Sequence, residues 1–154
     1  MGRAEDRLLE LGIKIPESPA PLGSYKPASV TGNLIFISGQ LPLSDGKLKH
    51  QGKVGSDVTV EDAILAARAS AINAIAAMSR ELGGIGRVRK IVKVTGYVAS
   101  APGFHNQAAV VNGASDLLFE VFGEDGRHAR AAVGVAELPM NAPVEIELIA
   151  EIFT

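Results

Sequence analysis

Arg130 is the residue whose surroundings most directly indicate chemistry. It lies in the segment HARAAVGVAEL, next to the small residues Ala129, Ala131 and Ala132. In a β-strand, side chains alternate between two faces, so Arg130 would share a face with His128 and Ala132 and have space beside it. A guanidinium in such a position can bind a carboxylate through two parallel hydrogen bonds. The alternative is an arginine paired with a structural carboxylate, and the sequence leaves both open.

A second set of candidate groups is the row of carboxylates in PVEIELIAEIF, where Glu145, Glu147 and Glu151 fall on one face of the predicted strand. They are either exposed charges on a half-solvated strand or include a general base that orients water. If the last two strands formed a simple hairpin turning near Asn141, Glu145 would lie roughly 20 Å from the residue opposite Arg130. The two groups can therefore share a site only if these strands are not directly paired, or if they come from different subunits.

Two weaker features complete the set of candidates. Tyr25 follows a Pro-rich segment, where a tyrosine is a core or interface anchor more often than a catalyst. The strand that ends in Ser38-Gly39-Gln40 offers exposed backbone N–H and C=O groups that could bind a small polar ligand.

Other kinds of site are disfavoured by what the sequence lacks. There is no cysteine, and His50, His105 and His128 occur in no metal-binding spacing. There is also no GxSxG, GxxxxGK[ST] or GxGxxG motif. We therefore expect neither a metal ion nor an organic cofactor.

Length and composition place the chain among ordinary globular proteins. Its 154 residues, 47% hydrophobic and 21% charged, predict one domain over 1–154, in which 1–20 form an N-terminal helix and a Pro-rich extension. A net charge of −2 and 5% aromatic residues argue against a nucleic-acid partner. The absence of cysteine, of a secretory signal and of a long apolar segment favours a cytoplasmic protein without a membrane partner.

Hydrophobic periodicity then predicts the elements that position these groups. Thr59 is suited to cap a long helix, and Arg68 falls near the middle of its apolar stripe, where it must be paired or reach toward solvent. The predicted elements are a helix over 3–11, a hairpin of 29–31 and 34–38 around Gly32-Asn33, a surface loop over 44–57, helices over 60–82 and about 104–122, and strands over 88–98, 128–138 and 144–153.

This order predicts an α+β fold with a single mixed sheet and two helices packed on one face. Several strands are apolar on both sides, so the opposite face must also be covered. In a chain this short, we expect an oligomer that packs sheet face against sheet face.

Taken in order, these segments resemble the YjgF/YER057c/UK114 family, also called the Rid or endoribonuclease L-PSP family. They cover nearly the whole chain after residue 20. The matching segments are PLGSY (21–25), GNLIFISGQLP (32–42), VKVTGYV (92–98), ARAAVGVA (129–136), LP (138–139) and VEIELIA (144–150).

The resemblance implies a chorismate-mutase-like fold and a homotrimer with clefts between subunits. It also implies hydrolysis of reactive 2-imino acids to 2-keto acids and ammonia without a cofactor. Carried over to this chain, Arg130 would hold the substrate carboxylate and Gly39 would contact it through its backbone. Tyr25 would line the cleft, and Glu145 would orient or activate water. Together with Ser38 and Ala132, these are the predicted site residues.

The sequence departs from the family pattern in four places. The usual Pro-Ala-Arg is His128-Ala129-Arg130, and the pocket position two residues later is Ala132. The second long helix is extended, and an extra helix precedes the matched region. The chain is therefore most similar to a divergent branch named as YjgF/chorismate mutase-like endoribonucleases.

Three functions follow from this comparison as hypotheses. The first is an imine deaminase or related small-molecule hydrolase whose partner is a carboxylate-bearing metabolite. The second is an endoribonuclease or translation inhibitor, which the net charge and the lack of a histidine pair disfavour. The third is a non-catalytic trimer that binds small carboxylates.

Overall fold

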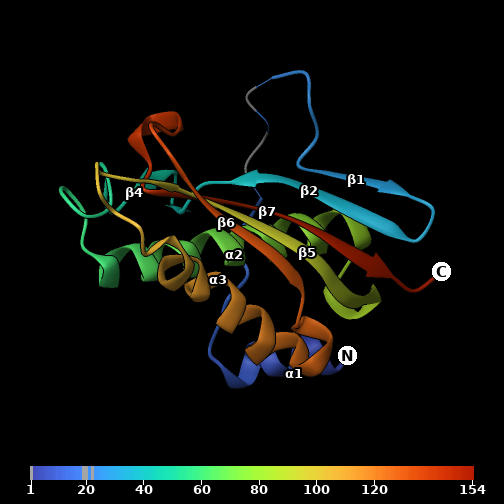
Figure 1. Ribbon diagram of the computed structural model, residues 1–154. Helices are drawn as coiled ribbons and strands as arrows, with labels where there is room; N and C mark the ends of the chain where they lie inside the picture. Colours follow the sequence, from blue (N-terminus) through green and yellow to red (C-terminus); the bar gives the residue numbers. More distant parts are fainter. Residues whose placement is uncertain (1, 19–20, 22) are drawn as a thin grey trace.

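The computed structural model describes residues 2–18, 21 and 23–154, and its centre is a five-stranded sheet in the order β1–β2–β7–β5–β6 (Figure 1). Residues 19, 20 and 22, which belong to the predicted Pro-rich extension and the first matching segment, lie outside the described residues. The strands are β1 Ala28–Thr31, β2 Leu34–Gln40, β5 Val88–Ala99, β6 Ala129–Val135 and β7 Val144–Ile152, with a small separate hairpin of β3 Leu43–Ser44 and β4 Lys47–Leu48. The helices are α1 Arg3–Glu10, α2 Val60–Leu82 and α3 Gln107–Phe122, with 3-10 turns η1 Ile85–Arg87, η2 Gly123–Gly126 and η3 Pro139–Asn141.

Most predicted elements are confirmed. The hairpin turns at Gly32-Asn33, and α2 has the predicted bounds. The Thr59 hydroxyl accepts the N–H of Asp62 at 3.1 Å, which satisfies one of the unpaired donors of the first helical turn. Gly83 ends α2 at φ 73°, a left-handed conformation that glycine adopts at little cost.

Three of the predicted elements differ from the structure by more than two residues or in kind. Helix α3 begins at Gln107 rather than near 104, because Pro102-Gly103 form a tight turn in which the Phe104 N–H donates to the Ala101 carbonyl at 3.0 Å. Strand β6 ends at Val135 rather than 138, because β5, its only partner in the sheet, ends at Ala99. The predicted loop 44–57 contains β4.

That loop is also less exposed than predicted. Val54 within it is fully buried, and its N–H donates to the Ala99 carbonyl at 2.7 Å. The part around Val54 therefore packs on the end of β5, whereas most of the segment, including residues 44–47 and 55–57, is exposed as predicted.

The sheet topology settles how the last two strands are related. Strand β6 pairs in parallel with β5, and β7 lies antiparallel between β2 and β5. Helix α2 connects β2 to β5, and α3 connects β5 to β6. Because β5 separates β6 from β7, these strands do not form a simple hairpin.

All three helices lie on one side of the sheet, as Figure 1 shows. Along β7 burial alternates strictly: Val144, Ile146 and Leu148 face the helices, while Glu145 and Glu147 face the other side. Alternating burial marks a sheet with one face packed on the core. We call the side away from the helices the open face.

Helices α2 and α3 pack closely against each other. Arg68 of α2 donates from both terminal nitrogens to one carboxylate oxygen of Glu120 on α3, each at 3.2 Å, which explains its place on the apolar stripe. At the crossing, Gly113 lies against the backbone of α2, where a Cβ would come within 2.9 Å of the Ile64 carbonyl carbon. The described residues contain no helix that is both long and apolar enough to cross a bilayer.

We expect Gly113→Ala to destabilise the protein by about 1–3 kcal/mol, because the added methyl group must push the two helices apart. At an uncrowded helical position the same change would stabilise by roughly 0.5–1 kcal/mol. Urea denaturation followed by circular dichroism measures the difference. A variant as stable as the unchanged protein would contradict the close approach of α2 and α3.

Candidate functional site

Arg130 projects from β6 toward α3, on the helix-covered side of the sheet. One terminal nitrogen, Nη1, donates to Asn112 Oδ1 at 2.7 Å and to Ser115 Oγ at 3.2 Å, and Nη2 lies 3.4 Å from the Ala108 carbonyl oxygen. All three acceptors are uncharged. Among the described residues, no Asp or Glu forms an ion pair with Arg130. The positive charge is therefore held in place without being neutralised, as an anion-binding group requires.

A hollow of about 360 Å³ lies beside this guanidinium. His128 lines it together with Arg130, as the alternation of β6 predicted, and Ala132 follows as a half-buried neighbour on the same face. The lining residues are Asn112, Ser115, Asp116, Phe119, Gly126, Arg127, His128 and Arg130. The space that the sequence predicted beside Arg130 is present.

The residues of α3 that hold Arg130 were missed by the sequence analysis. Ala108, Asn112 and Ser115 are spaced four and three residues apart, so they form one stripe along the helix. The sequence analysis identified only the apolar residues of this helix that face the core. The neighbouring stripe of small and polar residues follows from the same helical spacing and could have been found in the sequence.

Tyr25, Gly39 and Glu145 meet in a different hollow, of about 390 Å³. It also contains Met140 and Asn73. The Asn73 side chain, from α2, donates to the carbonyls of residues 41 and 43 at 2.9 Å each, which fixes the chain that leaves β2. The structure thus brings together three of the predicted site residues.

Gly39 makes room for the Glu145 carboxylate. The pairing of β2 with β7 shifts register between Ile37 and Gln40, so Gly39 lies in an irregular stretch of β2. A Cβ at Gly39 would lie 2.9 Å from Glu145 Cδ, too close for any larger residue without displacement of the carboxylate. The glycine is therefore required by the position of Glu145.

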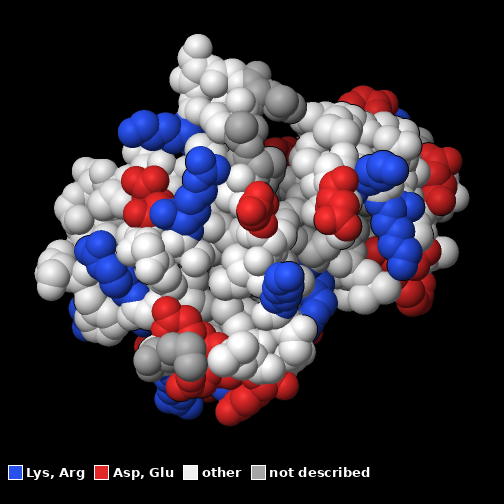
Figure 2. Space-filling view, turned by 180° about the vertical axis from the view of Figure 1, so that it is seen from behind, with Lys and Arg blue, Asp and Glu red and all other residues white. Residues whose placement is uncertain are grey.

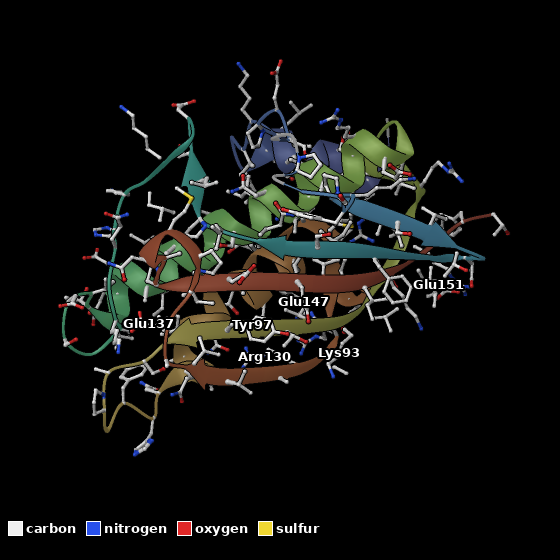
Figure 3. The ribbon with its side chains drawn as sticks, turned by 90° about the horizontal axis from the view of Figure 1, so that it is seen from above. Lys93, Tyr97, Arg130, Glu137, Glu147 and Glu151 are labelled. Atoms are coloured by element: carbon white, nitrogen blue, oxygen red, sulfur yellow. The ribbon has the colours of Figure 1, made fainter. Side chains whose placement is uncertain are left out.

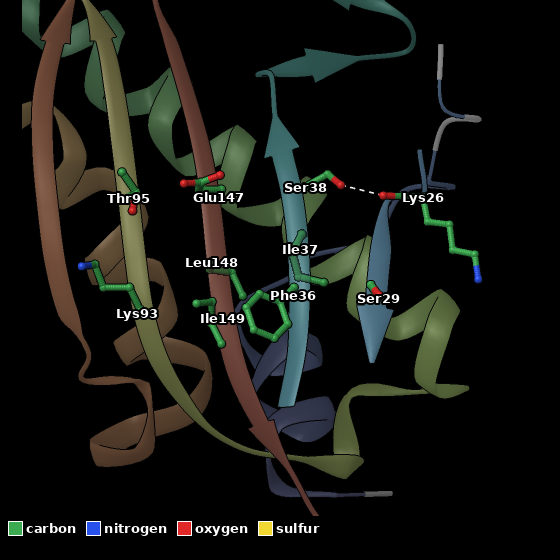
Figure 4. Close-up of a pocket in the computed structure, with 10 residues that line it drawn as sticks. All are labelled: Lys26, Ser29, Phe36, Ile37, Ser38, Lys93, Thr95, Glu147, Leu148 and Ile149. Carbon is green, nitrogen blue, oxygen red and sulfur yellow. Dashed lines mark hydrogen bonds between the residues drawn. The ribbon is translucent and has the colours of Figure 1, made fainter. Parts of the chain in front are cut away.

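Ser38 lies in a third hollow, of about 290 Å³, on the open face (Figure 4). Its hydroxyl donates to the Lys26 carbonyl at 2.6 Å. Phe36, Thr95 and Glu147 line the same hollow. Within one chain, Ser38 is thus not among the residues that surround Tyr25 and Glu145.

On the open face, the surroundings of Tyr97 and Glu145 raise the pKa values of both groups. Tyr97 donates its hydroxyl to Glu147 Oε1 at 2.7 Å, and Figure 3 shows the two side chains on neighbouring strands. The hydrogen bond to the Glu147 carboxylate, together with burial, raises the pKa of Tyr97 to about 12. Burial, and then the negative charge of Glu147, raises the pKa of Glu145 above its usual 4.5. Such a carboxylate is better suited to accept a proton than an exposed one.

Arg130 and Glu145 lie far apart in a single chain. Arg130 pairs with Val94, which pairs with Leu148, so Glu145 lies three residues further along β7 and two strands away. At ~3.3 Å per residue and ~4.8 Å per strand, these offsets are each about 10 Å. The two side chains also point to opposite faces of the sheet, so one small substrate cannot touch both groups of the same chain.

The raised pKa of Glu145 predicts a pH-dependent effect of Glu145→Gln on stability. Folding favours the protonated carboxyl, so its contribution is fully present below about pH 4.5 and is lost as the pH rises through the higher pKa of the folded state. Glutamine cannot ionise. We therefore expect the variant to unfold at a higher temperature than the unchanged protein at about pH 8 and at the same temperature at about pH 4.

Thermal unfolding at both pH values measures this difference, with the exposed Glu81→Gln as the matched control. If Glu145→Gln and the unchanged protein unfold at the same temperature at the higher pH, the surroundings of Glu145 do not disfavour its ionised form.

Known proteins resemble this chain over nearly its whole length. Residues 5–152 match the family described as "YjgF/chorismate mutase-like, putative endoribonuclease". The protein TCP17 of Trypanosoma cruzi is 43% identical over 98% of this chain and 95% of its own length. A protein of Dermatophagoides farinae named 2-iminobutanoate/2-iminopropanoate deaminase is 31% identical over 91% of this chain and 94% of its own.

Solved structures give the same result. Atu1372 of Agrobacterium tumefaciens, of unknown function, superposes with a TM-score of 0.91 at 47% identity, over 97% of this chain and 92% of that one. A Shewanella oneidensis protein named as a "putative endoribonuclease" superposes with a TM-score of 0.94 at 36% identity, over 98% of this chain and 100% of that one. TdcF of E. coli, solved with bound serine, superposes with a TM-score of 0.63 at 26% identity, over 89% of this chain and 94% of that one. Because both the sequence and the fold match from the first helix to the last strand, this chain belongs to the YjgF/chorismate mutase-like family.

Proposed function

We propose that this protein hydrolyses reactive 2-imino acids to 2-keto acids and ammonia, in clefts between the subunits of a homotrimer. The observation that carries this proposal is the Arg130 guanidinium, held only by uncharged acceptors beside a hollow. The relative named as a 2-iminobutanoate/2-iminopropanoate deaminase supports the reaction. TdcF with bound serine supports a small ligand that carries a carboxylate.

The site needs two copies of the chain because Arg130 and Glu145 point to opposite faces of the sheet. In an assembly, the Arg130 hollow of one subunit can meet the hollow of Tyr25, Gly39 and Glu145 of the next. The open face offers a further surface for contact between subunits, since Phe36 and Val133 are 40% and 41% exposed there.

The roles of the residues follow from the chemistry of the imine. Arg130 binds the substrate carboxylate and so places the C=N carbon in the cleft. Glu145 accepts a proton from water as the water oxygen bonds to that carbon, which gives a tetrahedral amino alcohol. Glu145 then returns the proton to nitrogen. The C–N bond breaks with its electron pair on nitrogen, so that ammonia leaves, and the hydroxyl proton passes to Glu145 and on to solvent as the C=O bond forms. A protonated imine is already electrophilic, so the protein needs only to position water and compensate charge.

Replacing Arg130 tests the proposal most directly. With freshly generated 2-iminobutanoate as substrate, we expect Arg130→Ala to lower kcat/KM by roughly 100-fold or more, because a charge-paired contact is lost. Arg130→Lys keeps the charge but not the paired geometry, so its kcat/KM should lie between those of Arg130→Ala and the unchanged protein. The exposed Arg87→Ala is the control and should retain full activity. Full activity of Arg130→Ala would overturn the proposed role of the guanidinium.

A separate prediction concerns Glu145. We expect Glu145→Gln to lower kcat by roughly 100-fold or more with little change in KM, because the proton acceptor is lost while carboxylate binding remains. The unchanged protein should lose activity as the pH falls through the pKa of Glu145, which lies above 4.5. A pH profile of kcat measures both effects. If the activity of Glu145→Gln falls at low pH as that of the unchanged protein does, the general base is another group.

The oligomeric state tests the shared cleft. Analytical ultracentrifugation should find a trimer at micromolar concentration, and mixing inactive Arg130→Ala with inactive Glu145→Gln subunits should restore part of the activity. Restoration is expected because some clefts then receive both intact residues. A stable monomer with deaminase activity would contradict the shared cleft.

Ribonuclease activity is the alternative that the family description and the Shewanella relative raise. Against it, Lys and Arg are interspersed with Asp and Glu on the surface in Figure 2, with no continuous basic area on that face. An RNA-cleavage assay on the same variants separates the two. Cleavage by the unchanged protein that is lost in Arg130→Ala, without imine hydrolysis, would favour a nuclease.

A further inference from the structure

His128 lies beside Arg130 in the same hollow, and the two are linked by Ser115. His128 Nε2 lies 2.9 Å from Ser115 Oγ, and Arg130 Nη1 donates to that oxygen at 3.2 Å. The other ring nitrogen, Nδ1, lies 2.7 Å from the Gly126 carbonyl oxygen. A continuous chain of hydrogen bonds thus runs from the guanidinium through a hydroxyl and an imidazole to the backbone.

The chemistry of the partners determines the direction of this chain. A carbonyl oxygen can only accept, so Nδ1 must carry the proton that it donates to Gly126. In a neutral imidazole Nε2 is then the acceptor, and the Ser115 hydroxyl donates to it. Ser115 Oγ in turn accepts from Arg130. The Ser115 proton therefore points toward His128, and none is left to donate into the hollow.

Protonation of His128 would reverse the middle bond. Nε2–H would donate to Ser115 Oγ, and that oxygen would also still accept from Arg130. The hydroxyl proton would then be free to turn into the hollow beside the guanidinium. The hollow would gain both a hydrogen-bond donor and a positive charge, and both favour a bound anion.

His128 is neutral near pH 7, since burial lowers its pKa and the positive charge of Arg130 lowers it further, against the raising effect of the Gly126 carbonyl. The charged residues that line the hollow come from every element around the imidazole. They are Arg130 of β6, Arg127 between η2 and β6, and Asp116 of α3. Two of the three are cationic, so they also disfavour the protonated ring.

We propose that Ser115 and His128 are positioning residues for the carboxylate site at Arg130, and that protonation of His128 turns the Ser115 hydroxyl toward the bound carboxylate. The inference rests on the carboxylate site of the proposed function. It adds a second donor beside the guanidinium and predicts tighter binding of a small carboxylate in acid. By linkage, the bound carboxylate must raise the proton affinity of His128 by the same factor, which raises the pKa of His128.

Binding of 2-oxobutanoate, the 2-keto acid left when 2-iminobutanoate is hydrolysed, tests this inference by calorimetry. We expect the Kd to fall about tenfold between pH 7.5 and pH 5.5, as for a hydrogen bond to a charged group. At the lower pH both Ser115→Ala and His128→Gln should bind more weakly than the unchanged protein. His128→Gln should lose the pH dependence, whereas Ser115→Ala should keep only the smaller part that comes from the charge of protonated His128. Ser115→Thr keeps the hydroxyl and should keep part of the dependence.

Two further variants isolate the cause. His105→Gln removes an exposed histidine outside the hollow and should behave like the unchanged protein. Glu145→Gln removes the carboxylate whose pKa is raised. It should also keep the pH dependence of binding, even though it changes catalysis.

Nitrogen-15 NMR of His128 supplies a readout that a merely structural role would not move. At about pH 7.5 we expect the neutral Nδ1–H tautomer, and addition of 2-oxobutanoate should raise the pKa of His128 more in the unchanged protein than in Ser115→Ala. The Nε2–H tautomer, no binding of 2-oxobutanoate, or an unchanged pH dependence in His128→Gln would each overturn the inference.

The outcomes also separate this inference from the proposed function. If 2-oxobutanoate binds with the expected pH dependence but no imine is hydrolysed, the inference holds and the proposed reaction fails. If imines are hydrolysed through Arg130 but His128→Gln binds as the unchanged protein does, the reaction holds and the inference fails.

Discussion

The proposed function depends on an arginine that is held in place without being neutralised. The Arg130 guanidinium lies against α3, where a carbonyl, an amide and a hydroxyl accept its protons. A carboxylate in their place would remove most of its attraction for an anionic ligand. Uncharged acceptors fix the side chain and leave its charge available to the adjacent hollow, which is the basis of the proposed carboxylate site.

The order of the strands determines what this arginine can work with. Because β7 lies between β2 and β5, β6 is an edge strand, and its Arg130 faces the helices while Glu145 of β7 faces away from them. A single chain thus carries the two halves of the proposed site on opposite faces of the sheet. The same arrangement leaves apolar side chains of the open face uncovered, so in the proposed assembly a second subunit would both complete the site and cover these side chains.

The polar groups of the two half-sites are tuned in opposite directions. Burial and a neighbouring negative charge raise the pKa of Glu145, and burial and a neighbouring positive charge lower the pKa of His128. The shift of Glu145 moves its pKa toward neutral pH, whereas the shift of His128 favours the neutral imidazole. In the proposed function, one half-site would hold the base for water, and the other an imidazole that is hydrogen-bonded through Ser115 to Arg130.

Most of the secondary structure is determined by the sequence alone, since periodicity, capping by Thr59 and the turn residues Gly32-Asn33 are local features. Which residues share a face with Glu145 in β7 and with Arg130 in β6 also follows from the alternation of side chains along a strand. The sequence could not determine the strand order, because pairing depends on contacts between distant segments. Tertiary structure alone decided that Arg130 lies beside Asn112 and Ser115, that His128 joins them, and that Ser38 is separated from Glu145. These contacts arise only when α3 packs across β6 and the irregular end of β2 lies against β7.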